Sequence, residues 1–399
     1  MKSERFGKSG PTTIVALAIV LASSMFAAFS EAQTFQTLHM FNGGTDGSTP
    51  MAGLMLDPKG NLYGATEYGG LTTCSSNGCG TVFRLNPRTN KYAVLHRFDA
   101  LKEGYDPIAG LVRDPSTNTL YGITRGNGYG AGQTIFQLDS LNRFKTLYAF
   151  TGKNDGIDPQ GGLLWDPVKH SLWGTTQSGV GKSGWGTIFE VSALSRRETS
   201  LYSFPGQPNG AMPQCTLISV RGSFFGTTLL GGAGNNGTVF TGAGNVIYSF
   251  NTSEFRGPYP GLAPGGPAGN PVGVTPTGGD HGQGMVYGFN NAGQFITLYS
   301  FQLGTGDGQH PEASVVIDKA SNIYGTTNDG GTSGVGTIFK VDKTGKETIL
   351  HNFTGYSDGS CPCSNLILDS KGNLYGTAST GGNLSCGTTG CGTVFEITP

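Results

Sequence analysis

Charged residues are sparse in this chain. Lys, Arg, Asp and Glu make up 13% of its 399 residues, against about 25% in an average globular protein. The net charge is −1, and no run of basic residues occurs after residue 32. Because affinity for nucleic acid depends on clustered Lys and Arg against phosphates, we expect no nucleic-acid partner.

Long apolar runs, helical periodicity and compact catalytic motifs are also missing. Beyond residue 32 no stretch reaches the ~18 apolar residues of a membrane span, so we expect none. No segment places apolar residues at helical spacing over a useful length. The chain has no Gly-x-Ser-x-Gly and no His-Glu-x-x-His, and Gly181-Lys182-Ser183 lacks the first glycine of a phosphate-binding loop.

The first 32 residues have the pattern of a Sec-type signal peptide. Lys2, Arg5 and Lys8 precede an uncharged apolar run at 13–29, and small residues flank a cleavage site after Ala32. The mature chain is then 33–399. No Cys stands at the cut, so we expect no lipobox, and we expect no sorting tail at the C-terminus. We therefore expect a secreted protein without an anchor.

Glycine is abundant, with 68 residues, but 36% of the chain is hydrophobic and the glycines recur in an internal repeat. The first marker of the repeat is Leu-x-x-Phe, whose phenylalanines have a mean spacing of 52 residues: Phe41, Phe98, Phe150, Phe204, Phe250, Phe301 and Phe353. The second marker, Gly-Thr-Val/Ile-Phe, occurs at 80–83, 186–189, 237–240, 336–339 and 392–395, with variants at 133–136 and 284–287. The third marker, Asn-Leu-Tyr-Gly-x-Thr, occurs at 61–66 and in variants at 119–124, 171–176, 223–228, 322–327 and 373–378.

Each unit contains four short apolar runs joined by turn residues. Many runs are apolar on both faces, so each strand must be covered on both sides. The pattern predicts an all-β fold, a seven-bladed β-propeller with four antiparallel strands per blade. The last unit lacks its fourth strand and 35–41 is an orphan fourth strand, so the N-terminal strand should pair with the last blade and close the ring. An open β-solenoid is the competing fold. We expect a single domain at 33–399.

The order Gly-Asn-Leu-Tyr-Gly-Thr, Gly-Gly, Gly-Thr-Val-Phe resembles the GloVer-type tandem repeat of exported bacterial proteins, over nearly all of 34–399. The resemblance implies export and a propeller-like repeat, and it supplies no catalytic residues. The unit at 251–294 is rich in Gly and Pro and lacks the Tyr-Gly-x-Thr marker. We expect it to be a degenerate blade.

The long loops, from strand two to strand three and from blade to blade, should share one face around the central channel, where function concentrates. A proline precedes each inner strand, and the residue before it should ring the channel mouth. These residues are Thr49, Asp106, Asp158, Met212, Tyr259, His310 and Cys361. Asp106, Asp158 and His310, with Glu312 nearby, are the candidate acid/base or cation-binding group. Ordinary turn chemistry is the stronger explanation for Asp before Pro.

Aromatic residues on the long loops are candidate stacking platforms for sugars, or else staples over the neighbouring blade. They are Tyr68, Tyr105, Tyr129, Trp185, Tyr259 and Tyr356. Four Asp-Gly pairs, at Asp46, Asp155, Asp307 and Asp358, either bind Ca²⁺ or simply form turns. The slot after Leu in the first marker holds His39, His96 and His351 or a Tyr, and is interpreted as structural.

Seven cysteines in an exported chain predict disulfides. Cys74 with Cys79 and Cys386 with Cys391 lie in the same loop of two units that become neighbours when the ring closes, so each pair should staple its own loop. A zinc site shared by the four thiolates is the alternative. The pairing of Cys215, Cys361 and Cys363 stays open.

The sequence therefore predicts a secreted, monomeric recognition module that binds an extracellular glycan or a cell-envelope protein through its long-loop face. No cofactor is expected, with Ca²⁺ as the one ion the loops could hold. The alternatives are a carbohydrate-active enzyme, a polysaccharide lyase or glycoside hydrolase, with its site at the channel mouth, and a structural surface protein.

Overall fold

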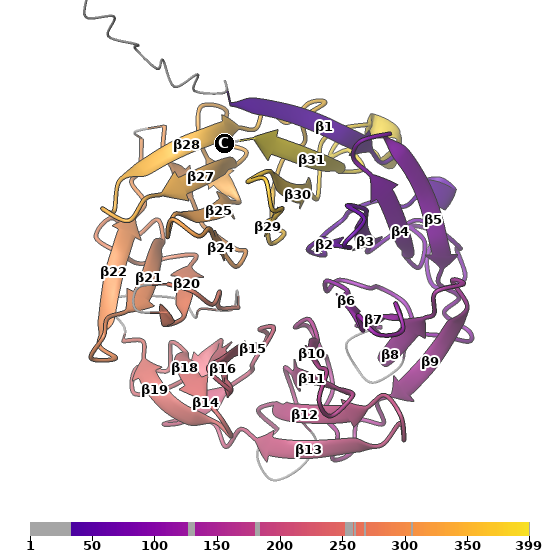
Figure 1. Ribbon diagram of the computed structural model, residues 1–399, viewed down its shortest axis with the longest axis horizontal. Helices are drawn as coiled ribbons and strands as arrows, with labels where there is room; N and C mark the ends of the chain where they lie inside the picture. The colour runs from indigo at the N-terminus through magenta and orange to yellow at the C-terminus, as the bar shows by residue number, and fades with distance from the viewer. Residues whose placement is uncertain are drawn as a thin grey trace, which may run out of the picture. The chain divides into compact units, whose positions relative to one another are not determined.

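The structure is a computed structural model, and it describes residues 33–126, 132–179, 184–251, 258, 261–266, 269–304 and 306–398. One compact unit begins at Gln33. Its blades are small antiparallel sheets that follow one another around a ring (Figure 1). The described residues contain no α-helix, and their short 3-10 turns include η1 (Gly44–Asp46) and η3 (Leu384–Cys386). The predicted all-β, seven-bladed propeller is confirmed.

Strands are numbered along the chain, and each blade runs from an inner strand at the channel to an outer strand at the rim. Blade one comprises β2 (Met55–Leu56), β3 (Leu62–Thr66), β4 (Thr81–Asn86) and β5 (Lys91–Arg97). Blade two comprises β6 (Val112–Arg113), β7 (Leu120–Thr124), β8 (Thr134–Leu138) and β9 (Phe144–Ala149). Blade three comprises β10 (Leu164–Asp166), β11 (Ser171–Thr176), β12 (Thr187–Ser192) and β13 (Glu198–Ser203).

Blade four comprises β15 (Ile218–Val220), β16 (Ser223–Thr228), β18 (Thr238–Thr241) and β19 (Asn245–Ser249), and blade five comprises β20 (Val272–Thr275), β21 (Met285–Phe289) and β22 (Phe295–Ser300). Blade six comprises β24 (Val316–Ile317), β25 (Ile323–Thr327), β27 (Thr337–Val341) and β28 (Glu347–Asn352). Blade seven comprises β29 (Ile367–Leu368), β30 (Leu374–Ala378), β31 (Thr393–Thr398) and, as its outer strand, β1 (Thr34–Met40). Four two-residue strands, β14 (Gly210–Ala211), β17 (Leu230–Gly231), β23 (Gly308–Gln309) and β26 (Asp329–Gly330), lie in the loops.

The second and third markers meet inside each blade because strands two and three pair in one register. In blade one Thr66 lies opposite Thr81, and their buried hydroxyls are 2.8 Å apart. The same 2.8 Å pair recurs in four further blades: Thr124–Thr134, Thr176–Thr187, Thr228–Thr238 and Thr327–Thr337. Each pair satisfies two buried polar groups at once, which explains why the markers contain Thr.

The glycine of the third marker is required by the phenylalanine of the second. A Cβ added to Gly64 would lie 2.5 Å from Cζ of Phe83, on the strand opposite. Equivalent contacts of 2.3 to 2.6 Å hold at Gly122, Gly174, Gly226, Gly325 and Gly376. The ring therefore occupies the place of a side chain, so these two markers act as one packing unit.

Phenylalanine pairs join the blades. The Phe that ends a fourth strand packs edge-on against the Phe of the third strand in the next blade, as Phe98 does against Phe136, with ring centroids 5.1 Å apart. The other interfaces repeat this geometry at 5.0 to 5.4 Å: Phe41–Phe83, Phe150–Phe189, Phe204–Phe240, Phe250–Tyr287, Phe301–Phe339 and Phe353–Phe395. Each such ring is buried, which contributes about 1.5–3 kcal/mol per side chain.

The Asn and Tyr of the third marker hold the turn between strands one and two. Asp57 accepts hydrogen bonds from the Asn61 amide groups, from the backbone N–H of Lys59 and from the Tyr63 hydroxyl. Burial raises the pKa of Asp57, but these bonds outweigh it and leave the pKa below its usual value. Asp318 and Asp369 form the same turn in blades six and seven.

Blade five corrects one expectation. The segment 272–275, Val-Gly-Val-Thr, is its second strand: Gly273 pairs with Tyr287 as Gly64 pairs with Phe83. The unit therefore keeps the Gly-x-Thr part of the marker, with Val in place of Tyr. In the described residues its sheet has three strands, and a single bridge between Ala263 and Val272 stands where an inner strand would lie. The degeneration concerns the inner strand.

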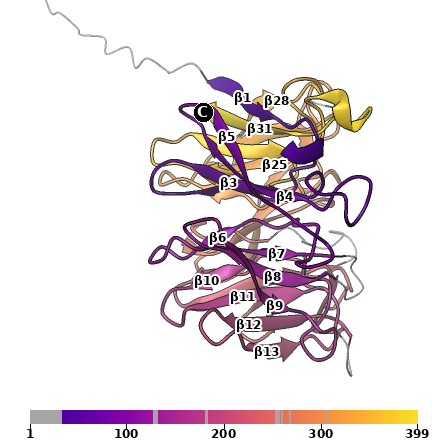
Figure 2. The same ribbon diagram turned by 90° about the vertical axis from the view of Figure 1, so that its right-hand side faces the viewer.

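The ring closes through the predicted strand exchange. β1 pairs antiparallel with β31 from Thr34 opposite Thr398 to Met40 opposite Thr393. On the channel side, the Thr377 hydroxyl donates a hydrogen bond to the carbonyl of Pro50 at 2.8 Å. The edge-on view shows β1 beside β31 (Figure 2). A chain contact across more than 300 residues thus completes the last blade.

Candidate functional site

The long loops share one face, as predicted. In blades one, three and seven the loop that enters the blade bridges to the loop between strands two and three, through Ser48 with Tyr68, Ile157 with Ser178 and Ser360 with Thr380. In blades four and six the same contact is the strand pair β14–β17 or β23–β26. Backbone hydrogen bonds therefore fix both kinds of loop to each other around the channel mouth.

A belt of repeated backbone geometry surrounds this mouth, and we call it the pre-proline belt. The residue before the proline has a left-handed φ of 49° to 57° in six blades, at Thr49, Asp106, Asp158, Met212, His310 and Cys361. In five of the six the N–H donates to the residue that precedes the second marker, as Asp106 donates to Cys79. In Asp158 the N–H donates to the Gln133 side chain instead. Each carbonyl accepts from the residue after the third marker, as Asp106 does from Arg125. A left-handed φ is costly for a side-chain-bearing residue, and these two bonds hold it.

The belt also corrects the register of blade five. A Cβ added to Gly80 would lie 2.5 Å from Cδ of Pro107, the proline that enters the next blade. The equivalent contact in blade four is between Gly237 and Pro258, at 2.8 Å. Pro258, not Pro260, is therefore the ring proline of blade five. Tyr259 follows the ring proline of this blade, so it does not occupy the pre-proline position, and it lies outside the described residues. The Gly- and Pro-rich stretch offered two prolines, and only packing distinguishes them.

Asp106 and Asp158 belong to one polar network at blades one to three. The Arg125 Nε donates to Oδ1 of Asp158 at 3.1 Å, and the Gln160 amide donates to Oδ2 at 2.9 Å. Gln160 also contacts Gln177. Arg125 and Glu67 follow the third marker in their blades and interact electrostatically with Asp106. Arg125 and Glu67 were not among the residues predicted from the sequence, although each directly follows the third marker of its blade.

The carboxyl groups of this network have raised proton affinity. Burial, followed by the nearby Glu67 carboxylate, raises the pKa of Asp106 to about 7, and Arg125 opposes the shift. Burial also raises the pKa of Glu67, against a hydrogen bond with Tyr68 and the charge of Arg125. Burial and the Glu67 charge raise the pKa of Tyr68 to about 12. Perturbed carboxyls beside a cation are typical of functional sites, although ion-pair networks also produce them.

His310 and Glu312 have other neighbours. His310 Nδ1 is 3.0 Å from Oδ2 of Asp329, the residue two after the third marker of blade six. Glu312 lines a hollow of about 180 Å³ in the central channel, together with Gln160, Gln214 and Cys363. Among the described residues no hydrogen bond or ion pair joins Asp106, Asp158, His310 and Glu312. Asp106 and Asp158 thus share one polar network, whereas His310 contacts Asp329 and Glu312 lines the channel hollow.

The predicted loop aromatics differ in exposure. Tyr356 is 78% exposed and Trp185 is 43% exposed, with its indole over Gly206. Tyr105 packs against Gly132, and Tyr68 is partly buried beside Glu67. Tyr129, like Tyr259, lies outside the described residues.

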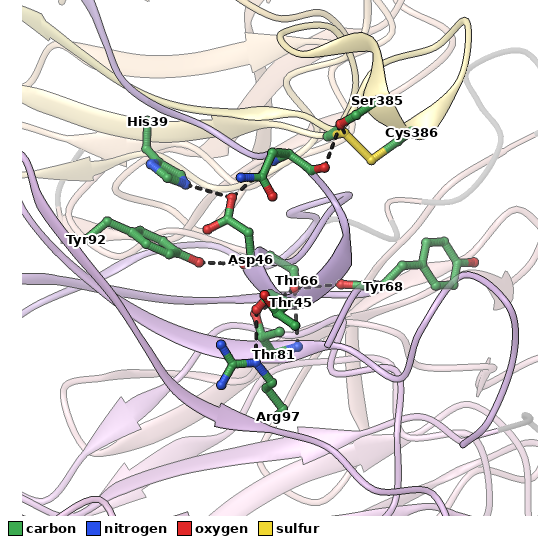
Figure 3. A network of polar contacts seen from close by, with 12 residues as sticks. His39, Thr45, Asp46, Thr66, Tyr68, Thr81, Tyr92, Arg97, Ser385 and Cys386 are labelled. Atoms are coloured by element: carbon green, nitrogen blue, oxygen red, sulfur yellow. Dashed lines mark hydrogen bonds and ion pairs between the residues drawn. A yellow bond between two sulfur atoms is a disulfide. The ribbon is translucent and has the colours of Figure 1, made fainter. Parts of the chain in front are cut away.

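The Asp-Gly pairs serve the fold in a way the sequence did not reveal. Each carboxylate accepts a hydrogen bond from the His or Tyr slot of the first marker: His39 with Asp46, Tyr148 with Asp155, Tyr299 with Asp307 and His351 with Asp358. Figure 3 shows the His39–Asp46 contact beside Tyr92, whose hydroxyl donates to the Asp46 carbonyl at 2.7 Å. In the described part of the chain no group of three His, Cys, Asp or Glu side chains is placed to hold a metal ion.

The cysteines form two short-range disulfides, Cys74–Cys79 and Cys386–Cys391. Because all four sulfurs are in disulfides, the alternative of a zinc site shared by four thiolates is wrong. Cys215, Cys361 and Cys363 are unpaired. Cys215 is buried and its Sγ accepts the N–H of Thr227, and burial raises the pKa of Cys363 to about 12.

A family model described as the Gloeobacter/Verrucomicrobia repeat matches residues 24–166, 68–243 and 241–399. The chain belongs to this repeat family. The match to the Gloeobacter/Verrucomicrobia repeat confirms the resemblance that the three markers suggested. No curated protein matches the chain.

Solved structures with a similar fold have unrelated sequences. Oligogalacturonate lyase from Vibrio parahaemolyticus superposes with a TM-score of 0.57 and 9% identity, over 92% of this chain and 96% of the other. A chain of the mitotic checkpoint complex gives 0.55 and 11%, over 99% and 98%. The extracellular domain of BT4673 from B. thetaiotaomicron, described as a one-component system, gives 0.53 and 10%, over 92% and 40%. At these identities the likeness concerns the fold alone.

Proposed function

We propose that this repeat protein is secreted and acts as a recognition module, binding an extracellular glycan or a cell-envelope partner through its long-loop face. Two disulfides support an oxidising location outside the cytoplasm, in agreement with the predicted signal peptide at 1–32. Among the described residues no helix is long and apolar enough to cross a membrane. We expect the module to work as a monomer.

The pre-proline belt is the observation that carries this proposal. Positions that serve the fold keep nearly one residue type in every blade, as the Thr and Phe pairs do. The belt instead repeats one backbone geometry while its side chains are Thr, Asp, Asp, Met, His and Cys. Varied side chains on a rigid, repeated backbone are the usual construction of a binding surface. Polar groups dominate in blades one to three, which favours a polar ligand there.

Retention on immobilised polymers tests the proposal. The purified protein is passed over neutral polysaccharides, acidic polysaccharides and isolated cell-envelope fractions, and the bound fraction is measured with and without Ca²⁺. We expect retention on at least one of them without any release of product. A protein that is folded by circular dichroism yet passes freely over every matrix would contradict the proposal and leave a structural surface role.

The pair of Asp106 and Glu67 favours a carbohydrate-active enzyme as the second candidate. A carboxyl group whose pKa is about 7, next to a second carboxylate and Arg125, is suited to general acid or base chemistry. Release of reducing or unsaturated ends from the same polysaccharides is the measurement. An enzyme would lose turnover in Asp106→Asn and keep it in Asp280→Asn, which alters an exposed carboxyl in the loop between the second and third strands of blade five. The absence of product release from every polymer would exclude this candidate for the panel.

A further inference from the structure

Two of the loops on the long-loop face differ from the rest in length. In blades one and seven, fourteen residues separate Thr66 from Thr81 and Ala378 from Thr393. In the remaining blades the same loop has nine or ten residues, as between Thr327 and Thr337. Both long loops contain a disulfide. They are distant in the sequence, and closure of the ring makes them neighbours.

The two loops have the same internal construction. Parallel bridges join Gly69 to Gly78 in one and Gly381 to Gly390 in the other. The N–H of Gly69 donates to the Asn77 carbonyl at 2.7 Å, and that of Gly381 donates to the Thr389 carbonyl at 2.7 Å. A disulfide closes each loop across five residues. Two matched, cross-linked loops therefore stand as rigid walls on either side of the closing seam.

The segment after β1 joins these walls. The Ser385 hydroxyl donates to the carbonyl of Asn42 at 2.5 Å, and the N–H of Thr49 donates to the Cys391 carbonyl at 2.9 Å. On the other side the N–H of Gly70 donates to Gly44 at 2.6 Å. Figure 3 shows Ser385 and Cys386 on one side of this segment and Tyr68 on the other. Between them lies a hollow of about 440 Å³, which we call the seam hollow.

The seam hollow is polar and carries no charged residue among the residues that line it in the described chain. The residues that line it include Asn42, Ser76, Asn77, Thr389 and Tyr68. In the part of the chain that the structure describes, the side chains of Asn42, Asn77 and Thr389 have no hydrogen-bond partner. Amides and hydroxyls present both donors and acceptors to a ligand.

We infer that the seam hollow is a subsite for a neutral sugar, which deepens the proposed glycan recognition and rests on it. Sugar hydroxyls need paired donors and acceptors, which the Asn and Thr side chains supply, and a sugar face packs on an aromatic ring such as Tyr68. A uronate or phosphate would lose hydration with no cation among the lining residues to compensate, and it would approach Tyr68, on which the Glu67 carboxylate acts as well as Arg125. The volume lies within the ~300–1,000 Å³ range of ligand pockets.

Titration calorimetry of the full mature protein against defined hexasaccharides tests this assignment. The neutral probes are the hexamers of β-glucan, xylan, mannan and chitin, and the acidic probe is the galacturonate hexamer. Two variants change the seam hollow: Tyr68→Ala removes the stacking ring, and Ser76→Trp fills the hollow from an exposed position. Ser333→Trp is the matched control, because Ser333 is an exposed serine in the corresponding loop of blade six. Melting curves establish that all variants fold.

We expect at least one neutral hexamer to bind, with affinity reduced about tenfold or more by Tyr68→Ala and by Ser76→Trp and unchanged in the control. The galacturonate hexamer should not bind. Neutral binding that survives both seam variants would overturn the assignment and leave glycan recognition standing elsewhere on the face. Binding of the acidic hexamer alone would overturn the neutral-sugar class. A failure of every probe, together with no retention on any polysaccharide, would overturn the proposed glycan recognition as well.

Discussion

Phe41, at the end of the first strand, packs edge-on against Phe83 of blade one, with ring centroids 5.3 Å apart. The same pair joins Phe98 to Phe136 between blades one and two at 5.1 Å. The closing interface is therefore built like an internal one. Its two partners come from the same end of the chain, but the strand that Phe41 follows completes the sheet of the last blade.

Truncation of Phe41 should destabilise the whole ring. We expect Phe41→Ala to lower the free energy of unfolding by about 3–5 kcal/mol, because it empties a fully buried site. Phe98→Ala, at an internal interface, is the reference and should cost a similar amount. Urea unfolding monitored by fluorescence gives both values. An open solenoid would instead show local fraying and a small loss for Phe41→Ala, and deletion of 33–41 would leave its melting curve unchanged.

Two half-buried glutamates should make the protein less stable above about pH 7 than in acid. Glu198 and Glu347 occupy positions where other interfaces have an aromatic ring, and burial, followed by the charge of Asp155 or Asp307, raises each pKa from 4.5 to about 7. The folded state then retains a proton that the unfolded state loses, so stability falls as the pH rises from 4.5 through about 7.

The double variant Glu198→Gln, Glu347→Gln should remove this loss. At pH 8 it should unfold at higher urea than the native protein, and at pH 4 the two should coincide, because both glutamates are then neutral in either state. The Oε1 atom of each glutamate is buried and has no hydrogen-bond partner among the described residues, which is consistent with a neutral carboxyl group. Equal stability at pH 8 would show that solvent reaches these carboxylates.

Reduction of the disulfides should abolish glycan binding while it lowers the melting temperature of the ring only slightly. Each crosslink closes a short loop, so its loss should cost about 2 kcal/mol or less. The strands that carry the loops keep their Thr and Phe contacts. Binding and melting temperature are measured with and without dithiothreitol. A variant with Cys74, Cys79, Cys386 and Cys391 all replaced by Ser is the control, and it should not respond to the reductant.

Arg125→Ala should raise the pKa of Asp106 above its native value of about 7, because Arg125 is the charge that opposes burial and Glu67. Carboxyl ¹³C NMR titration of the labelled protein measures the shift. Arg143→Ala, which breaks an exposed ion pair with Asp139 on the outer part of blade two, is the control and should leave Asp106 unchanged. An unchanged midpoint in Arg125→Ala would mean that water screens the network.

The fold was largely predictable because its contacts recur at a fixed spacing. The Phe, Thr and Gly of the markers each contact a marker residue in the same or the next blade, so periodicity along the chain reports contact in space. The His or Tyr slot was rightly read as structural, but its Asp partner was not foreseen. That hydrogen bond links a residue of the outer strand to a loop residue seven or eight positions later, as His39 and Asp46 are, and the intervening residues vary.

The candidate site was predicted only in part. The prolines in the sequence located the pre-proline positions, but the partners of these residues were not predicted. Asp158 bonds with Arg125, and Asp106 interacts electrostatically with Arg125 and Glu67. His310 contacts Asp329. Those partners follow the third marker, and the chain path between strands two and three had to be known before they could be assigned to the mouth. Blade five shows the same limit, since the choice between Pro258 and Pro260 depends on packing against Gly237.

The sequence by itself determined the repeat, the all-β class, the number of blades and the pairing of the first strand with the last, because each follows from local residue type and period. The tertiary structure alone decided which loops face each other across the seam. The seam hollow combines Asn42, Tyr68 and Asn77 with Thr389, and their meeting depends on ring closure, which brings the two ends of the chain together without leaving any mark in the local pattern.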